Sequence, residues 1–147
     1  SNLRQAIRAL PPAVHPIRIS PVYETLPWGY EQQPAFLNAA LEAESHLKPG
    51  ALLAHLKEIE TRLGRQPGVR YGPRVIDLDI LFYDMQVVRL PGLEIPHPHL
   101  HERAFVLVPL ADLAPNWAHP VIQRTIWELL QGVDQSGVQL YPEQLHL

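Results

Sequence analysis

Two aspartates, Asp77 and Asp79, stand two residues apart inside the apolar run VIDLDILFY. Strands disfavour aspartate because its short side chain competes for backbone hydrogen bonds, so the pair is unusual there. Side chains two residues apart on a strand face the same way, roughly 6.5 Å apart. Carboxylates so placed can hold one or two Mg²⁺ ions, with phosphate oxygens as further ligands. A solvated sheet face is the simpler interpretation of the pair taken alone.

Arginine is concentrated just before these aspartates. The chain has ten Arg and two Lys, and four of the arginines fall within thirteen residues: Arg62, Arg65, Arg70 and Arg74. The guanidinium group presents a rigid fork of donors that matches phosphate oxygens. In a chain of net charge -3, such a cluster predicts a small anionic ligand and favours the metal-phosphate interpretation of the aspartates.

Two polar side chains fall where the surrounding pattern predicts apolar ones. Glu60 lies on the apolar stripe of a predicted helix, where it either pairs with Arg62 or Arg65 or serves a nucleotide site. Asn38 lies in mid-strand, and a buried amide must be hydrogen-bonded. Its partner is either a neighbouring loop or the edge of a bound heterocycle, on which Phe36 could stack from the same face.

Three histidines alternate in the motif HPHLH, at His97, His99 and His101. Solvated surface residues are the simplest interpretation, and a zinc site would lack cysteine or a suitably spaced carboxylate. A third interpretation makes His97 and Arg103 phosphate contacts, because both cations stabilise charge on phosphoryl oxygens.

The composition indicates one globular domain of 147 residues, with 46% hydrophobic and 18% charged residues. No cysteine is present, so disulfides are excluded. No apolar run reaches the roughly 18 residues of a membrane span, and no signal-peptide pattern is visible, so a cytoplasmic protein is expected. The net charge argues against a non-specific nucleic-acid binder.

The apolar periodicity predicts helices and strands in alternation, with local hairpins, which is typical of an α+β fold with a largely antiparallel sheet. The predicted helices span 2–10, 49–63, 101–112 and 125–130, and the predicted strands span 14–25, 35–45, 75–83 and 86–90. The segments 26–34 and 65–73 are predicted to be loops, and the tail from residue 132 is left unassigned.

Four segments together resemble the 6-hydroxymethyl-7,8-dihydropterin pyrophosphokinase family of folate biosynthesis. They are YETLPWGYEQQPAFLNAA (23–40), IETRLGR (59–65), RYGPRVIDLDILFY (70–83) and IPHPHLHERAFVLVPL (95–110). The resemblance covers about residues 2–130. It implies a ferredoxin-like α+β fold, two Mg²⁺ ions, and transfer of pyrophosphate from ATP to the pterin hydroxymethyl group with release of AMP.

The resemblance also implies a role for individual residues of this chain. The residues matching the family's catalytic positions are Arg65, Arg74, Asp77 and Asp79, and the two aspartates are the expected metal ligands. Pterin binding is implied for Thr25, Phe36, Asn38, Tyr71 and Phe105. Nucleotide binding is implied for Glu60, Arg70, Arg74, Ile80, His97 and Arg103.

The sequence departs from the family pattern in three places. Members open with a strand that ends in a GSN-like turn, and this strand is expected to be absent before residue 1 of a single domain spanning 1–147. Gln66 and Pro67 stand where some members carry another arginine. Trp28 and Tyr71 differ from the residues some members use around the pterin. The loops 26–35 and 65–74 are expected to act as lids that exclude water.

Two other function classes remain open from the residues alone. One is a different magnesium-dependent phosphotransferase, with the aspartates and arginines but no pterin pocket. The other is a ferredoxin-like module that binds a regulatory ligand or RNA, which the acidic balance disfavours. The favoured interpretation is a monomer that acts on small molecules, with no nucleic-acid or membrane partner.

Overall fold

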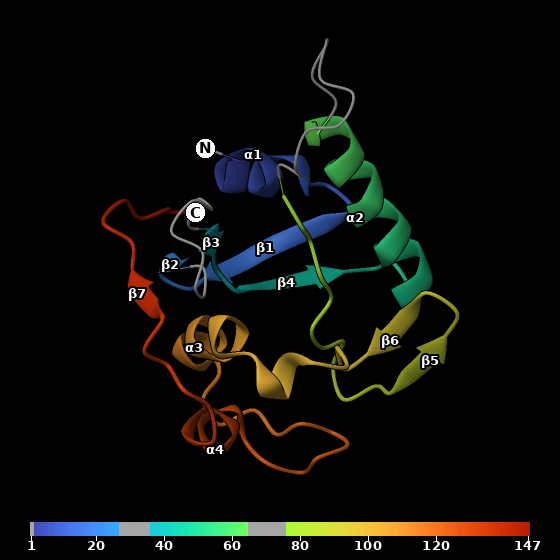
Figure 1. Cartoon of the computed structure of the whole chain (residues 1–147). Coiled ribbons are helices and arrows are strands. Elements are labelled where there is room, and N and C mark those ends of the chain that lie inside the picture. Colours follow the sequence, from blue (N-terminus) through green and yellow to red (C-terminus); the bar gives the residue numbers. More distant parts are fainter. Residues whose placement is uncertain (1, 27–35, 65–75) are drawn as a thin grey trace.

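The computed structural model describes residues 2–26, 36–64 and 76–147 (Figure 1). Its elements, in chain order, are α1 (Asn2–Ala9), β1 (Val14–Ile19), β2 (Tyr23–Thr25), β3 (Phe36–Asn38), β4 (Leu41–Ser45), α2 (Pro49–Gly64), β5 (Val88–Leu90), β6 (Leu93–Ile95), the 3-10 turn η1 (Leu100–Glu102), α3 (Ala104–Leu113), α4 (Ile126–Gln131) and β7 (Val138–Leu140). The fold is α+β, as predicted, and is consistent with the ferredoxin-like class. In the described part of the chain, no helix has both the length and the hydropathy of a membrane span.

The strands pair antiparallel in every sheet that the described residues form. β1 pairs with β4, β2 lies between β3 and β7, and β5 and β6 form a hairpin. The helices α1 and α2 contact each other beside the β1–β4 pair (Figure 1). The core between them is built from Leu10, Val14, Leu56 and Ile59. The apolar stripe that predicted helix 49–63 is therefore the face that α2 buries.

The predicted strands 14–25 and 35–45 each divide into two strands that belong to different sheets. The division occurs at Ser20 and Ala40, where the Ser20 N–H donates to the Ala40 carbonyl at 2.9 Å. The Ala40 N–H in turn donates to the Ser20 hydroxyl oxygen at 2.8 Å. Pro21 has no N–H, so the ladder cannot continue through it. A side chain thus completes the pairing where both strands change sheet.

A second core holds the C-terminal half together. Leu100, Leu107 and Ile126 are fully buried where η1, α3 and α4 meet. Helix α4 begins at a capping box, in which the Thr125 hydroxyl accepts from the Glu128 N–H and the Glu128 carboxylate accepts from the Thr125 N–H. The predicted helix 125–130 is confirmed, and the predicted helix 101–112 begins later, at Ala104.

The prediction of a strand over 75–83 is wrong for its described part, 76–83, which joins no sheet. Two of its backbone groups make hydrogen bonds that do not belong to a β-ladder. The Leu78 N–H donates to a carboxylate oxygen of Glu60 at 3.0 Å. The Leu81 carbonyl accepts from the His97 N–H at 3.0 Å. The segment is thus extended without a partner strand in the described residues.

The tail that the sequence left unassigned contacts β2 and the residue before it. β7 pairs with β2, and the side-chain amide of Gln144 then clamps the buried Val22. The Val22 N–H donates to Gln144 Oε1 at 2.6 Å, and Gln144 Nε2 donates to the Val22 carbonyl at 3.1 Å. The tail therefore fixes the position of β2 from the side opposite β3.

Candidate active site

Burial alternates along the segment that carries Asp77 and Asp79, in keeping with the predicted period of two. Both aspartates are exposed, whereas Ile76 is buried. Leu78 and Ile80 pack against the core formed by α2 and β1. Burial of the apolar residues leaves both carboxylates exposed, although no strand of the described ranges pairs with this segment. The Ile80 side chain packs against this core. The expected contact of Ile80 with the nucleotide is therefore assigned to its backbone.

Glu60 reaches from α2 to the aspartate segment. Its Oε2 accepts the Leu78 N–H at 3.0 Å, and its Oε1 lies 3.2 Å from Lys57 Nζ. The Glu60 side chain is only 11% exposed, while Lys57 is 52% exposed. Among the described residues its ion-pair partner is thus Lys57, one turn earlier on the helix, and not the predicted Arg62. Lys57 was not among the predicted site residues, although its three-residue spacing to Glu60 was an available signal.

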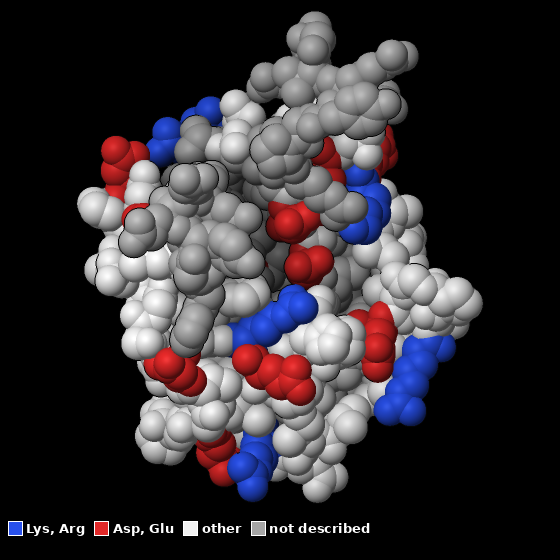
Figure 2. Space-filling model, in the orientation of Figure 1, with Lys and Arg blue, Asp and Glu red and all other residues white. Residues whose placement is uncertain are grey.

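His97 lies close enough to both Asp79 and Arg103 for their charges to affect its own. Burial is the largest cause lowering the pKa of His97; the Asp79 carboxylate raises it, and Arg103 lowers it. The bond from the His97 N–H to Leu81 ties the histidine segment to the aspartate segment. Figure 2 shows that acidic and basic side chains adjoin near the centre of one face of the molecule. Such a mixed site suits a ligand that brings both phosphates and a cation.

The other two histidines of the HPHLH motif lie beside Glu102, and the His99 ring also meets the His97 ring edge to face, with centroids 6.3 Å apart. His101 lies in η1, so the chain is not extended over the whole motif, as a common direction of the three rings would require. His99 Nδ1 and His101 Nε2 lie 3.7 Å and 3.4 Å from carboxylate oxygens of Glu102. Across the described ranges, no three His, Asp or Glu side chains converge as metal ligands.

An aromatic pair lies beside the charged residues. Phe36 of β3 and Phe105 of α3 meet edge to face, with ring centroids 5.6 Å apart and an interplanar angle of 85°. The Arg103 guanidinium carbon lies 5.8 Å from the Phe105 centroid. The structure thus brings together the two rings that the resemblance assigns to the pterin. The contact of Arg103 with Phe105 also connects these rings to a residue that the resemblance assigns to phosphate binding.

The polar residues assigned to the pterin lie on the strands next to this pair. Asn38 Nδ2 points at Thr25 Oγ1 across the β2–β3 pairing, at 3.5 Å. A separation of this length is at the limit of a hydrogen bond. In the same register Thr25 faces Phe36, so the two polar groups and one ring come from a single pair of strands. The predicted combination of an amide, Asn38, and an aromatic ring, Phe36, on one strand is therefore present.

A long-range hydrogen bond that the sequence analysis missed holds β2 against α3. The Tyr23 hydroxyl donates to Asp112 Oδ2, 89 residues further along the chain. Burial, followed by this bond to the carboxylate, raises the pKa of Tyr23 to about 12. No local pattern could reveal the contact, because neither residue lies near the other in sequence.

Several residues with expected roles lie outside the described residues. They are Arg65, Arg70, Tyr71 and Arg74, together with Trp28, Gln66 and Pro67. The lid assignments of loops 26–35 and 65–74 fall largely on the same ranges.

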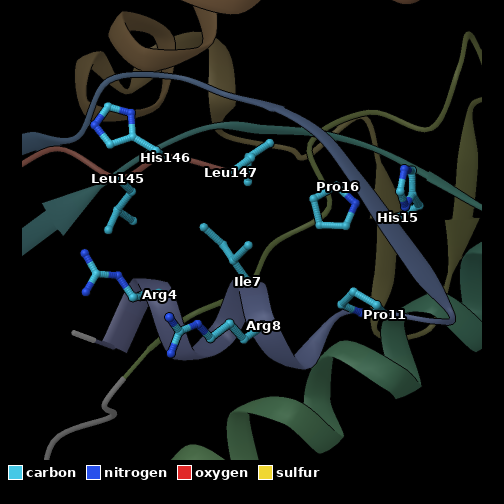
Figure 3. A pocket seen from close by; sticks show the side chains of 9 residues that line it. All are labelled: Arg4, Ile7, Arg8, Pro11, His15, Pro16, Leu145, His146 and Leu147. Atoms are coloured by element: carbon cyan, nitrogen blue, oxygen red, sulfur yellow. The ribbon is translucent and has the colours of Figure 1, made fainter.

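A cavity of about 430 Å³ lies elsewhere, between α1, β1 and the last residues of the chain (Figure 3). Arg4 and Arg8 line it from one face of α1, opposite His146 (Figure 3). None of the residues predicted for the site lines this cavity. The charged site around the aspartates is thus a different part of the molecule.

Comparison with known proteins identifies the family. The model of the 7,8-dihydro-6-hydroxymethylpterin-pyrophosphokinase family matches residues 1–115. The 2-amino-4-hydroxy-6-hydroxymethyldihydropteridine pyrophosphokinases of Aquifex aeolicus and Pseudomonas aeruginosa are 40% and 41% identical, over 87% and 89% of this chain and 80% of each relative. The folic acid synthesis protein FOL1 of Dictyostelium discoideum is 46% identical over 79% of the chain, which spans only 18% of that relative. The resemblance seen in the sequence is confirmed, and the chain belongs to the 7,8-dihydro-6-hydroxymethylpterin-pyrophosphokinase family.

Proposed function

We propose that this chain transfers a pyrophosphoryl group from ATP to the hydroxymethyl oxygen of 6-hydroxymethyl-7,8-dihydropterin. The pterin oxygen attacks the β-phosphorus, the bond to the α-phosphate oxygen breaks, and AMP leaves. Family membership supports this reaction. The observation that carries it to named residues is the cluster of Asp79, His97 and Arg103 beside the ring of Phe105. Phosphate-binding and ring-binding groups therefore adjoin, as transfer between two bound substrates requires.

The donor set of the aspartate segment fits magnesium. Mg²⁺ is held by one or two carboxylates and completes its octahedron with phosphate oxygens and water. Asp77 and Asp79 are both exposed, so two ions could be held without further protein ligands. When bound, the ions would neutralise charge on the transferred phosphates. Asp77 and Asp79 would hold the ions at the exposed side of the segment.

The remaining assignments rest on the resemblance, and for the described residues their positions in the fold support them. Thr25 and Asn38 would bond the pterin edge, and Phe36 and Phe105 would stack on its two faces. His97 and Arg103 would contact phosphate oxygens, and the Ile80 backbone the nucleotide. The arginines and tyrosine of the segment 65–75 keep their proposed roles on the resemblance alone, namely Arg65, Arg70, Tyr71 and Arg74.

The domain organisation, oligomeric state, partners and compartment are also proposals. The family match over residues 1–115 supports one pyrophosphokinase domain, which we take to act as a monomer on small molecules alone. The cytoplasm is the proposed compartment, although the Pisum sativum relative, 47% identical, carries a mitochondrial designation in its name. That relative is called bifunctional, and the chain spans 29% of its length.

Product analysis separates the proposed reaction from its nearest rival. The chain is incubated with magnesium, ATP and 6-hydroxymethyl-7,8-dihydropterin, and the products are quantified by chromatography and mass spectrometry. Equal amounts of AMP and pterin diphosphate are expected. A different magnesium phosphotransferase would yield ADP and a monophosphate, or would ignore the pterin.

A binding measurement addresses the non-enzymatic rival. Calorimetry is performed with the pterin, with and without a non-hydrolysable ATP analogue and magnesium. Saturable pterin binding is expected. A folded chain that binds RNA but no pterin would refute the proposal.

A further inference from the structure

The carboxylate of Glu60 occupies a position between α2 and the two aspartates. Leu78, whose N–H donates to Glu60 Oε2 at 3.0 Å, is the residue between Asp77 and Asp79. The second oxygen, Oε1, lies 3.2 Å from the ammonium group of Lys57. With the side chain only 11% exposed, Glu60 lies against the aspartate segment and not in open solvent.

The hydrogen bond from the Leu78 N–H to Glu60 takes the place of the backbone hydrogen bond that a neighbouring strand would supply. The described part of the segment, 76–83, joins no sheet, so within the described ranges no neighbouring strand pairs with Leu78. A hydrogen bond to an ionised acceptor is roughly twice as strong as a neutral one. Glu60 thus supplies one strong anchor at the centre of the segment.

This anchor controls the direction of both aspartates. Successive side chains of an extended segment point to opposite sides. Fixing the peptide plane at Leu78, with its side chain in the core, therefore directs Asp77 and Asp79 outward together. If the peptide turned, the two carboxylates would lose their common direction.

We propose that Glu60 is a positioning residue for the metal-binding aspartates, and that it acts through the Leu78 N–H instead of by contact with the nucleotide. Both of its oxygens are already engaged by protein groups, which favours this role over that of a direct ligand. The inference rests on the proposed function for its catalytic consequence. The hydrogen bond and its effect on cation binding can be tested without that function.

The test compares Glu60→Ala with Glu60→Gln, and uses Glu58→Gln as the matched control on the exposed face of the same helix. Glutamine retains an oxygen that can accept the Leu78 N–H, whereas alanine does not. Circular dichroism first establishes that each variant is folded.

The first readout is hydrogen exchange of the Leu78 amide by NMR in the metal-free protein. Protection is expected in the wild type, in Glu60→Gln and in Glu58→Gln, and loss of protection in Glu60→Ala. Unchanged protection in Glu60→Ala would overturn the inference.

The second readout is Mn²⁺ affinity in the presence of a non-hydrolysable ATP analogue, measured by electron paramagnetic resonance. Loss of a group that orients metal ligands weakens binding by about 10- to 100-fold. That loss is expected for Glu60→Ala, with a clearly smaller loss for Glu60→Gln, whose amide oxygen is a weaker, neutral acceptor. Equal loss in both variants would show that the charge matters directly, and would also overturn the positioning role.

Turnover completes the test. Glu60→Ala should need more Mg²⁺ for half-maximal rate, with little change in the KM for pterin. If the wild-type chain produced no AMP, the proposed function would fail while the exchange and Mn²⁺ results still decided the role of Glu60.

Discussion

Phe36 and Phe105 contact each other edge to face, 5.6 Å between centroids at an angle of 85°. A pterin stacked between the two rings would contact one face of each ring. The rings must therefore separate and rotate before a pterin can enter. Phe36 is 44% exposed and lies on the short strand β3, whereas Phe105 belongs to α3. We therefore expect Phe36 to make the larger movement.

Replacing either ring should weaken pterin binding selectively. Loss of one stacking partner costs about 1–3 kcal/mol, so Phe36→Ala should raise the pterin Kd by roughly 5- to 150-fold. Calorimetry with the pterin measures the change. Affinity for the ATP analogue serves as the control and should change little, since the ring is assigned to the pterin alone. A parallel loss of nucleotide affinity would contradict the assignment.

Removing one aspartate charge should abolish turnover without unfolding the chain. Asp79→Asn removes a ligand for a cation whose charge stabilisation is worth several kcal/mol, so AMP formation should fall by at least about 10³-fold. Chromatographic assay of AMP gives the rate. Asp84→Asn is a suitable control: Asp84 is exposed and has a φ of 50°, which asparagine tolerates. Comparable loss in both variants would place the effect outside the site.

Stability should fall as the pH drops below about 6.5 because of His119. Its Nδ1 accepts the N–H groups of Val121 and Ile122 at 3.1 Å and 3.0 Å, which requires an unprotonated nitrogen. Burial, and then the charge of His101, lowers the pKa of His119 in the folded chain. The unfolded chain therefore takes up a proton first, and the contribution of His119 is complete above 6.5 and declines as the pH falls toward the folded pKa.

Urea unfolding at several pH values from 7.5 to 5 would measure this dependence. His97 has a pKa shifted in the same direction, so the wild type alone cannot isolate one histidine. His119→Gln should have a smaller fall in unfolding free energy between these limits than the wild type. An unchanged slope in that variant would assign the pH dependence to other groups.

The Gln144 clamp should contribute measurably to stability. Val22 is 1% exposed, and both of its backbone polar groups bond the Gln144 amide. Gln144→Ala leaves the buried N–H without this acceptor, a loss that costs about 1–3 kcal/mol. Thermal unfolding would show the lower Tm. Gln139→Ala, at an exposed position of β7, should leave the Tm nearly unchanged.

The local pattern predicted the elements whose stability is local. The apolar stripe of 49–63 became α2, with its predicted side buried against β1. The alternation around Asp77 and Asp79 predicted the exposure of both aspartates and the burial of their apolar neighbours, even though the predicted strand was wrong. Side-chain direction in an extended segment follows from its own backbone and from which residues are apolar. Strand pairing also needs a neighbour, which no local pattern contains.

The sequence by itself therefore determined the chemistry that this protein can perform: two carboxylates, a run of arginines, and an amide beside a ring. Only the tertiary structure decided how these groups are held. It brought the Phe105 ring to Phe36, the Tyr23 hydroxyl to Asp112, and the carboxylate of Glu60 to the peptide between the aspartates. The physical reason is that these contacts join distant residues, and they form only when burial of the two cores brings the elements together.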